Sequence, residues 1–334
     1  MGISEAIMIT EFRFILAYSN PAYFKTLILK PDQCHGFLCC STIALSTQSI
    51  KFFTMLRILL PTDFSENTYE AIQYALKTFK DIESTFYLLH TYMPPVYHAE
   101  YLVGSPGLIG LSDLIRKAAV ENLEKLRTRI EKEHSNNKHT FNSLACLNTL
   151  TNEISRMVPE EEIDLILMGT KGATGAKEIL FGTNTVDIIK RAKCPVIAVP
   201  PNFEYEVPKE ILFPTDYEVD FKTVPLKVLL SIARKHVSSI EVLHVSNGYD
   251  LTKQQIKNQA KLDKELKGIP HLFHNPHNQE IIDAINDFQL KHKMNLLVMV
   301  QNKHTFVERL FIEPVIKKIG FHITIPFMVL PDLK

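Results

Sequence analysis

The stretch Gly169-Thr-Lys-Gly172-Ala-Thr-Gly175-Ala-Lys-Glu-Ile-Leu-Phe-Gly182-Thr183 is the most informative part of this chain. It follows a short apolar run at 163–168 and precedes a helix-like segment at 184–193. Glycines between a strand and a helix let the backbone approach a ligand closely and leave N–H groups that point at it. Such a position favours an anion, most often a phosphate group. The stretch, called the glycine loop below, therefore predicts a nucleotide-phosphate site.

The spacing of the glycine loop differs from the common phosphate-binding patterns. A P-loop ends in Gly-Lys-Ser/Thr, whereas Gly175 is followed by Ala-Lys-Glu. The dinucleotide fingerprint is Gly-x-Gly-x-x-Gly after the first strand of a βαβ unit, whereas this loop reads Gly-x-x-Gly-x-x-Gly after a late strand. Protein-kinase signatures are also missing from the sequence. The pattern that remains is Gly, two residues, Gly, nine residues and Gly-Thr.

That pattern, at the end of the run Asp164-Leu-Ile-Leu-Met-Gly169, resembles the ATP-binding signature of the universal stress protein family. Three further segments resemble strands of that family in the same order. Residues 56–65, Leu-Arg-Ile-Leu-Leu-Pro-Thr-Asp-Phe-Ser, resemble the first strand and its acidic end. Residues 86–91, Phe-Tyr-Leu-Leu-His-Thr, resemble the second strand, and 193–199, Lys-Cys-Pro-Val-Ile-Ala-Val, resemble the fifth. Together these matches cover most of 56–200.

The resemblance implies a site for ATP, alone or with Mg²⁺. Asp63 is expected to hydrogen-bond the adenosine, next to walls of the adenine and ribose pocket, and the glycines with Thr183 are expected to hold the phosphates. Local alternatives stay open: Asp63 and Ser65 can cap the following helix, and Thr183 can cap the helix after the loop. Lys171 either neutralises phosphate charge or is a solvated loop residue. The expected nucleotide-binding set is Pro61, Thr62, Asp63, Thr91, Met168, Gly169, Thr170, Lys171, Gly172, Gly182, Thr183 and Asn184.

The second half of the chain repeats the first. Residues 210–217 echo 57–64, and further echoes pair 240–245 with 87–91, 295–299 with 164–168, and 325–330 with 194–199. The Pro-rich segment 201–208 separates the copies. The sequence thus predicts a nucleotide-binding domain at 55–200, a linker at 201–208 and a degenerate second domain at 209–334.

Strand–helix alternation in both copies predicts an α/β fold of two tandem doubly wound domains. Each is expected to be an open, mostly parallel five-stranded sheet with helices on both faces. Ligands then bind beyond the carboxyl ends of the strands, where Asp63, Thr91 and Gly169 all fall. The expected helices are 66–78, 112–133, 150–159 and 184–193, and then 221–235, 252–267, 278–292 and 307–319.

The two copies differ at the glycine loop and at one insertion. Aligned without gaps, the three glycines and the threonine become Val300, Lys303, Glu313 and Pro314 in the second copy. A β-branched residue resists positive φ, and proline has no N–H, so no nucleotide is expected there although Asp216 is kept. The first copy has an insertion at 93–111, and its glycines and Pro106 predict a flexible lid or a surface loop.

The first 54 residues match neither copy. Glu5 and Glu11 disfavour a secretory signal, and the uncharged stretch 36–50 is too short to span a bilayer. Met55 stands immediately before the first family-like strand. The sequence therefore favours a start at Met55, with 1–54 a mis-called extension or a poorly ordered tail.

Charge and cysteine content disfavour several classes of partner and binding site. Zero net charge with a pI of about 7.2 gives no sign of a nucleic-acid or membrane partner. Five cysteines, two of them adjacent, favour a reducing cytoplasm over a disulfide framework. His271, His274 and His277 are spaced by threes but would not share one face of a strand, so no metal site is expected.

The combined reading is an ATP-binding stress-response or regulatory switch with nucleotide in the first copy only. A nucleotide-free tandem interaction scaffold is the alternative, and a slow ATPase or autophosphorylating protein is a further one. No catalytic residues are expected, because no motif sets a general base beside a nucleophile. The family's separate chains dimerise through the fifth-strand edge, so 196–199 and 327–330 are expected to pair as an intramolecular pseudo-dimer. A homodimer and a regulatory protein partner stay open.

Overall fold

Strands and helices alternate through most of each half, because short apolar runs alternate with amphipathic stretches. In the first half they are β1 (Leu56–Pro61), α2 (Glu66–Thr78), β2 (Ser84–Tyr92), α3 (Pro106–Glu133), β3 (His139–Leu147), α4 (Leu150–Glu160), β4 (Leu165–Gly169), α5 (Thr183–Arg191) and β5 (Val196–Val199). The second half contains β6 (Glu210–Pro214), α6 (Lys227–His236), β7 (Ser239–Leu243), α7 (Lys253–Glu265), β8 (His271–His274), α8 (Ile281–Lys291), β9 (Leu296–Gln301) and β10 (Phe327–Pro331).

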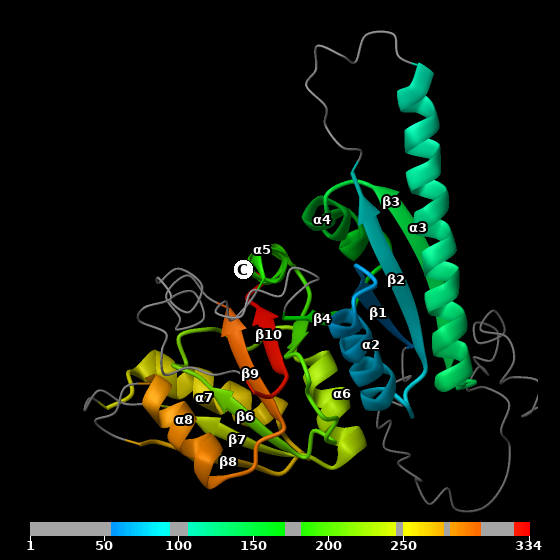
Figure 1. The fold of residues 1–334 in the computed structure, drawn as a ribbon. Coiled ribbons are helices and arrows are strands. Elements are labelled where there is room, and N and C mark those ends of the chain that lie inside the picture. The colour runs from blue at the N-terminus through cyan, green and yellow to red at the C-terminus, as the bar shows by residue number, and fades with distance from the viewer. Residues whose placement is uncertain (1–54, 94–105, 171–181, 245–249, 277–280, 302–323) are drawn as a thin grey trace, which may run out of the picture. The chain divides into compact units, whose positions relative to one another are not determined.

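This computed structural model describes residues 55–93, 106–170, 182–244, 250–276, 281–301 and 324–334 (Figure 1). All of them belong to one unit of the chain, Phe53–Lys334. The expected helix at 307–319 and the N-terminal segment 1–54 lie outside the described residues.

The strands form one ten-stranded sheet in the order β3-β2-β1-β4-β5-β10-β9-β6-β7-β8. Neighbours within each half are parallel, and β5 pairs antiparallel with β10 where the halves meet. The prediction of an α/β fold with mostly parallel strands is confirmed. Parallel strands buried on both faces need continuous apolar runs, as in β4 and β10, where every residue is buried.

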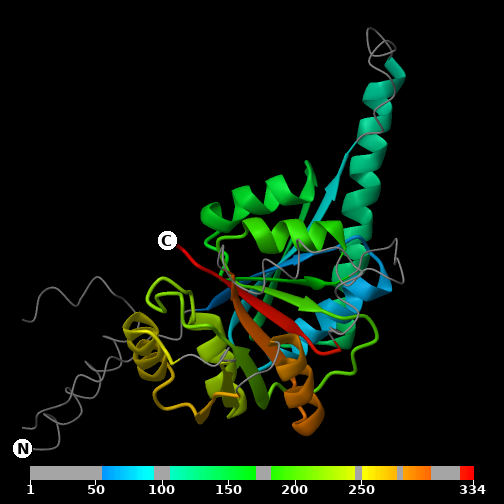
Figure 2. The same cartoon turned by 90° about the vertical axis from the view of Figure 1, so that its left-hand side faces the viewer.

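Helices cover both faces of the sheet and create two core layers (Figure 2). One layer gathers apolar side chains of α2, α3, α6 and α7 against the sheet. The other gathers side chains of α4, α5 and α8. Each layer contains residues of both halves, so the core is continuous across the β5–β10 junction. Polar contacts also cross between the halves: Lys227 Nζ lies 2.6 Å from Asp164 Oδ1, and His236 Nε2 donates to the Thr78 carbonyl oxygen at 2.8 Å.

Two helices begin six residues away from the predicted start, and proline explains both. Helix α3 begins at Pro106 rather than at 112, so Gly107 and Gly110 of the supposed flexible insertion are helical. Proline suits the first turn of a helix, where its missing N–H costs nothing. Helix α6 begins at Lys227 rather than at 221, because Pro225 disfavours helical backbone at the residue before it. The rest of the insertion, 94–105, lies outside the described residues.

His139, the first residue of β3, is expected to make stability pH-dependent. Its Nε2 donates to the Phe79 carbonyl oxygen at 3.1 Å, while its buried Nδ1 has no partner among the described groups. Burial lowers the pKa of His139 below its ordinary value, and the Phe79 hydrogen bond opposes this only in part. Below about pH 6.5 the unfolded chain therefore binds a proton that the folded chain resists.

The free energy of unfolding should accordingly fall as the pH is lowered from 7.5 to 5.5. Urea denaturation at these two pH values measures the effect, and His139→Gln should show a smaller pH dependence than the wild type. An equal dependence in both proteins would assign the effect to other groups, of which His134 is one because burial also lowers its pKa.

Candidate functional site

The turn after β1 is held by its own backbone and side chains. The Thr62 N–H donates to the Leu89 carbonyl oxygen at 2.8 Å, which continues the β1–β2 ladder, and Thr62 Oγ1 accepts from the Phe64 N–H at 3.0 Å. Phe64 has a φ of 64°, and its ring lies 4.4 Å from the His90 ring. His90 Nδ1 lies 2.8 Å from the Thr62 carbonyl oxygen, so Nδ1 is the ring nitrogen that carries hydrogen.

Asp63 supports the start of α2. Its Oδ1 accepts from the Ser65 N–H at 3.0 Å, and from Ser65 Oγ and Thr68 Oγ1, both at 2.6 Å. Ser65 is the N-cap, and its side chain accepts from the Thr68 N–H. The capping alternative is therefore confirmed for Ser65, and Asp63 supports this cap through Ser65 and Thr68. The Asp63 side chain is also exposed, and its hydrogen bond to adenosine stays a prediction.

The second half builds the same turn. Thr215 Oγ1 accepts from the Tyr217 N–H at 3.1 Å, and Tyr217 has a φ of 56° with its ring 5.0 Å from that of His244. His244 Nδ1 donates to the Thr215 carbonyl oxygen at 2.9 Å. The second half thus has the same turn of threonine, aspartate and aromatic residue, with a histidine on the next strand. No nucleotide is expected in this half. Sequence reasoning missed the aromatic member, although the aromatic residue recurs at this position in both copies.

The two ends of the glycine loop are fixed next to each other. Gly169 ends β4 in register with Val199, and the Thr170 N–H donates to the Val199 carbonyl oxygen at 2.9 Å. The Gly182 N–H then donates to the Thr170 carbonyl oxygen at 2.7 Å, which closes the loop onto the strand end. Between these ends, Lys171 and Gly172 lie outside the described residues.

Helix α5 begins at the far end of this loop. Gly182 is its N-cap, in extended conformation and without a side-chain capping bond, and Thr183 is its first helical residue. The alternative in which Thr183 caps the helix is therefore wrong. A helix leaves its first N–H groups without intrahelical partners, and no side chain at Gly182 occupies them. Thr183 and Asn184 are both exposed at this end.

Thr185 is a further member of this region that sequence reasoning missed. Its buried Oγ1 donates to the Gly169 carbonyl oxygen at 3.1 Å and thereby ties the first turn of α5 to the end of β4. The sequence shows a hydroxyl residue in the first turn of the helix, but it does not show that the end of β4 lies beside this residue. The role of Thr185 therefore follows only from the structure.

The predicted residues at the strand ends share one edge of the sheet. Strand β1 lies between β2 and β4, and all three are parallel, so their carboxyl ends are neighbours. This brings the described members of the predicted set to one edge, with Thr91 half-buried in β2 and Met168 and Thr170 buried at the end of β4. Of the predicted set, Gly182, Thr183 and Asn184 reach this region at the start of α5.

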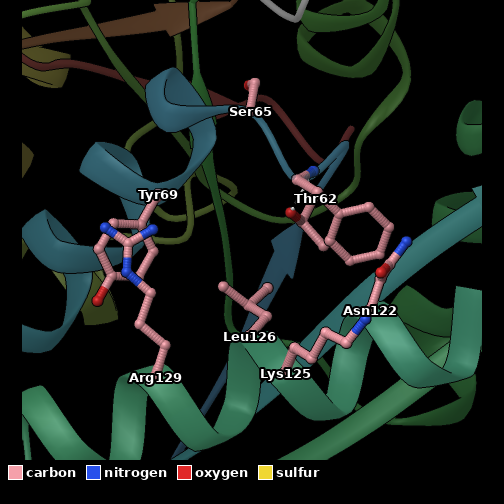
Figure 3. Close-up of a pocket in the computed structure, with 8 residues that line it drawn as sticks. Thr62, Ser65, Tyr69, Asn122, Lys125, Leu126 and Arg129 are labelled. Atoms are coloured by element: carbon pink, nitrogen blue, oxygen red, sulfur yellow. Dashed lines mark hydrogen bonds between the residues drawn. The ribbon is translucent and has the colours of Figure 1, made fainter.

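A cavity of about 280 Å³ adjoins the turn at Thr62, between α2 and α3 (Figure 3). Thr62 and Ser65 line one side, and α3 contributes polar side chains that the sequence did not single out. The Arg129 guanidinium lies over the Tyr69 ring at 3.6 Å and hydrogen-bonds Glu66 at 3.0 Å. The lining also includes Phe64, Asn122, Lys125 and Leu126.

The cavity wall is held by a hydrogen-bonded group on α2 and α3. The Tyr69 hydroxyl donates to Glu133 Oε2 at 2.5 Å, and Arg129 Nε donates to Glu133 Oε1 at 3.2 Å. Burial, followed by the hydrogen bond to Glu133, raises the pKa of Tyr69 to about 12. Tyr69 is therefore a neutral hydrogen-bond donor at physiological pH.

Neither a metal centre nor a membrane span emerges from the described part of the chain. Within it, no three histidine, cysteine or acidic side chains gather as metal ligands. His271 Nε2 lies 3.0 Å from Asp263, His274 Nε2 lies 2.5 Å from Glu241, and His277 lies outside the described residues. No helix in the same residues is long and apolar enough to cross a bilayer.

Comparison with known proteins identifies the family. Residues 55–200 match the model of the universal stress protein family. Universal stress protein MJ0531 of Methanocaldococcus jannaschii is 32% identical over 143 residues, which cover 43% of this chain and 81% of the relative. Universal stress protein MJ0577 of the same organism is 28% identical over 152 residues, 43% of this chain and 93% of the relative.

A solved structure extends the similarity in fold to both halves. The crystal structure of a universal stress protein from Archaeoglobus fulgidus DSM 4304 has a TM-score of 0.58 at 19% identity. It covers 82% of this chain and 97% of its own. On the sequence match to its curated relative, together with this fold, the chain belongs to the universal stress protein family.

Proposed function

We propose that the half at 55–200 binds ATP at the carboxyl ends of β1, β2 and β4, and that the chain acts as a nucleotide-dependent switch in a stress response. The observation that carries this proposal is the N-terminus of α5, which Gly182 leaves without a side-chain cap at the edge where Thr62 and Asp63 lie. Unpaired N–H groups and the helix dipole favour an anion at that position. Family membership supports an adenine nucleotide as the source of that anion.

The proposed site contains the nucleotide-binding set stated above. Thr62, Asp63 and Thr91 would surround adenosine, and the loop from Gly169 to Thr183 would hold the phosphates. Lys171 and Gly172 belong to the proposal on sequence alone. Mg²⁺ would accompany ATP through the phosphates, since no cluster of metal ligands exists among the described side chains.

We propose one nucleotide per chain, because the equivalent strand end in the second half differs. Val300 of β9 is in register with Leu330 of β10, as Gly169 of β4 is in register with Val199 of β5. A buried β-branched side chain thus stands where glycine lets the backbone approach a ligand. Asp216 remains in place, but its Oδ1 accepts from the Glu218 N–H within the turn.

The two halves, 55–200 and 209–334 with the linker 201–208 between them, would act as a pseudo-dimer. The antiparallel pairing of β5 with β10 supports this arrangement. Nucleotide occupancy would then alter contacts to a regulatory protein partner or to a second chain. Cysteine usage supports a cytoplasmic location.

A nucleotide-free tandem scaffold is the second candidate, and one observation favours it. The turn of threonine, aspartate and aromatic residue is the same in both halves, and Asp63 already has a structural task at the start of α2. Weak ATP hydrolysis or autophosphorylation would be a side activity of the first candidate, with Thr183 as the hydroxyl nearest the proposed phosphates.

Nucleotide content separates these candidates. The full chain is purified, denatured and assayed for released adenine nucleotide by chromatography, and the emptied protein is titrated with ATP with and without Mg²⁺. We expect about one equivalent per chain and, at 100 times the dissociation constant, a gain of about 2.7 kcal/mol in unfolding free energy. If the protein contains no nucleotide and binds no ATP, the nucleotide-free scaffold is the remaining candidate. Two equivalents of nucleotide per chain would contradict the proposal that the second half binds none.

A further inference from the structure

Helices α4 and α8 cover the same face of the sheet in the two halves, but the side chains beneath them differ. The strand registers make the comparison direct. In the first half Leu89 of β2 pairs with Leu144 of β3, and in the second half Leu243 of β7 pairs with His274 of β8. A histidine thus occupies the position where the first half has a partly buried leucine packed against the core.

A second exchange lies on the neighbouring strand. Leu59 of β1 pairs with Tyr87 of β2, and the equivalent Leu212 of β6 pairs with Glu241 of β7. Strand side chains two residues apart share a face, so Glu241 lies on the same face as Leu243. The second half therefore has a carboxylate and an imidazole where the first half has a tyrosine and a leucine.

The covering helix is also less deeply buried in the second half. Met157 of α4 and Phe288 of α8 lie at the same sequence distance before Leu165 and Leu296, which hold equivalent positions in β4 and β9. Met157 is only 1% exposed, whereas Phe288 is half-buried. The core layer is therefore less tightly covered by α8 than by α4 at this position.

A cavity of about 490 Å³ lies at this position. Its volume falls within the usual range of small-molecule sites, about 300–1,000 Å³. Leu243, Ala284 and Phe288 form apolar parts of its wall, and His274, Lys291 and His292 contribute polar groups. The rings of Phe288 and His274 are 5.0 Å apart, and those of Phe288 and His292 are 4.6 Å apart, so aromatic faces line one side.

Hydrogen bonds hold the polar groups at the cavity wall in fixed positions. Glu241 is mostly buried, its Oε2 lies 2.5 Å from His274 Nε2, and its Oε1 accepts from Ser239 Oγ at 3.1 Å. Both carboxylate oxygens are thus satisfied, and Nε2 is the nitrogen that donates to Glu241. The His274 ring is held at the cavity wall by this bond.

Hydrogen-bond donors outnumber acids in the lining. Lys291 is its cationic side chain, and His274, His292 and the Asn275 amide add donors. Asp287 is the acidic side chain of this lining. We propose that this cavity is a second ligand site, distinct from the ATP site, for a small carboxylic acid with an aromatic body: the carboxylate lies by Lys291 and the ring packs against Phe288.

Benzoate is the probe for this site, and neutral benzamide is its control. Saturation-transfer NMR on the full chain detects the contact, and isothermal titration compares the affinities of variants. Lys291→Gln should weaken benzoate binding by about three- to fivefold, as expected for a partly solvated ion pair of up to about 1 kcal/mol. Lys264→Gln, in the last turn of α7, is the matched control and should change nothing. Ala284→Met should abolish transfer, because Ala284 is a buried part of the cavity wall.

Stronger transfer to benzoate than to benzamide, its sensitivity to Lys291→Gln, and no displacement by ATP would support the second site. Equal transfer to both probes, no transfer at millimolar benzoate, or equal affinity in the wild type and Lys291→Gln would overturn it. Displacement by ATP would also overturn it, since the ligand would then occupy the nucleotide site. Lys291 is exposed, so its substitution keeps the test decisive even if Ala284→Met fails to fold.

Discussion

Replacing Phe327 with alanine is expected to lower the free energy of unfolding by about 3–5 kcal/mol. Phe327 is fully buried at the start of β10, in register with Ala198 of β5. The small alanine leaves room that the phenylalanine ring fills at the junction of the two halves. Truncation would set two alanines opposite each other and leave a cavity in a core layer that both halves share.

Equilibrium urea denaturation of the full chain measures this loss. Val329→Ala is the control on the same strand. Val329 is in register with Val196, and this substitution removes less volume than Phe327→Ala. Adding Ala198→Phe to Phe327→Ala restores the total volume with the ring on the other strand, and it should recover part of the stability. A loss below about 1 kcal/mol in Phe327→Ala would show that this junction relaxes around the missing ring.

Gly182→Asp is expected to weaken ATP binding by about two orders of magnitude without harming the fold. Gly182 has φ −63° and ψ 153°, which any L-residue adopts, and aspartate is a favoured N-cap. The helix should therefore be as stable or more stable. Its carboxylate would stand at the N-terminus of α5, where the phosphates are proposed to bind. Two unit charges about 5 Å apart at an effective dielectric constant of about 20 repel by about 3 kcal/mol, which is about a hundredfold in affinity.

Gly182→Asn is the matched control, since asparagine has the same shape, caps a helix equally well and carries no charge. Isothermal titration with ATP should give a far smaller loss for the asparagine variant than for the aspartate variant. Thermal unfolding of both confirms that the fold is intact. Equal affinity of the two variants for ATP would show that the phosphates do not bind at the N-terminus of α5. The glycine loop would then be only a structural connection.

Features that depend on neighbours in the sequence were predictable. Helix α2 runs from Glu66 to Thr78 as expected, because Ser65 is a capping residue and an amphipathic pattern follows it. The order of strands and helices followed from the alternation of apolar runs with amphipathic segments. The starts of α3 and α6 were wrong by several residues although each depends on a proline, since a periodic pattern alone does not show which side of a proline is helical.

The sequence by itself thus determined the α/β class and the strand ends that carry Asp63 and Gly169, while the tandem domains and the loss of the glycine loop in the second half stay predictions. Only the tertiary structure decided which side chains meet beyond one turn. Glu241 and His274 are 33 positions apart and become partners through the β7–β8 register, while Arg129 reaches Glu66 across 63 positions through the packing of α3 on α2. Local propensity sets elements, but register and helix packing are chosen by burial of the whole core, so the cavity under α8 has no signature in any single stretch of sequence.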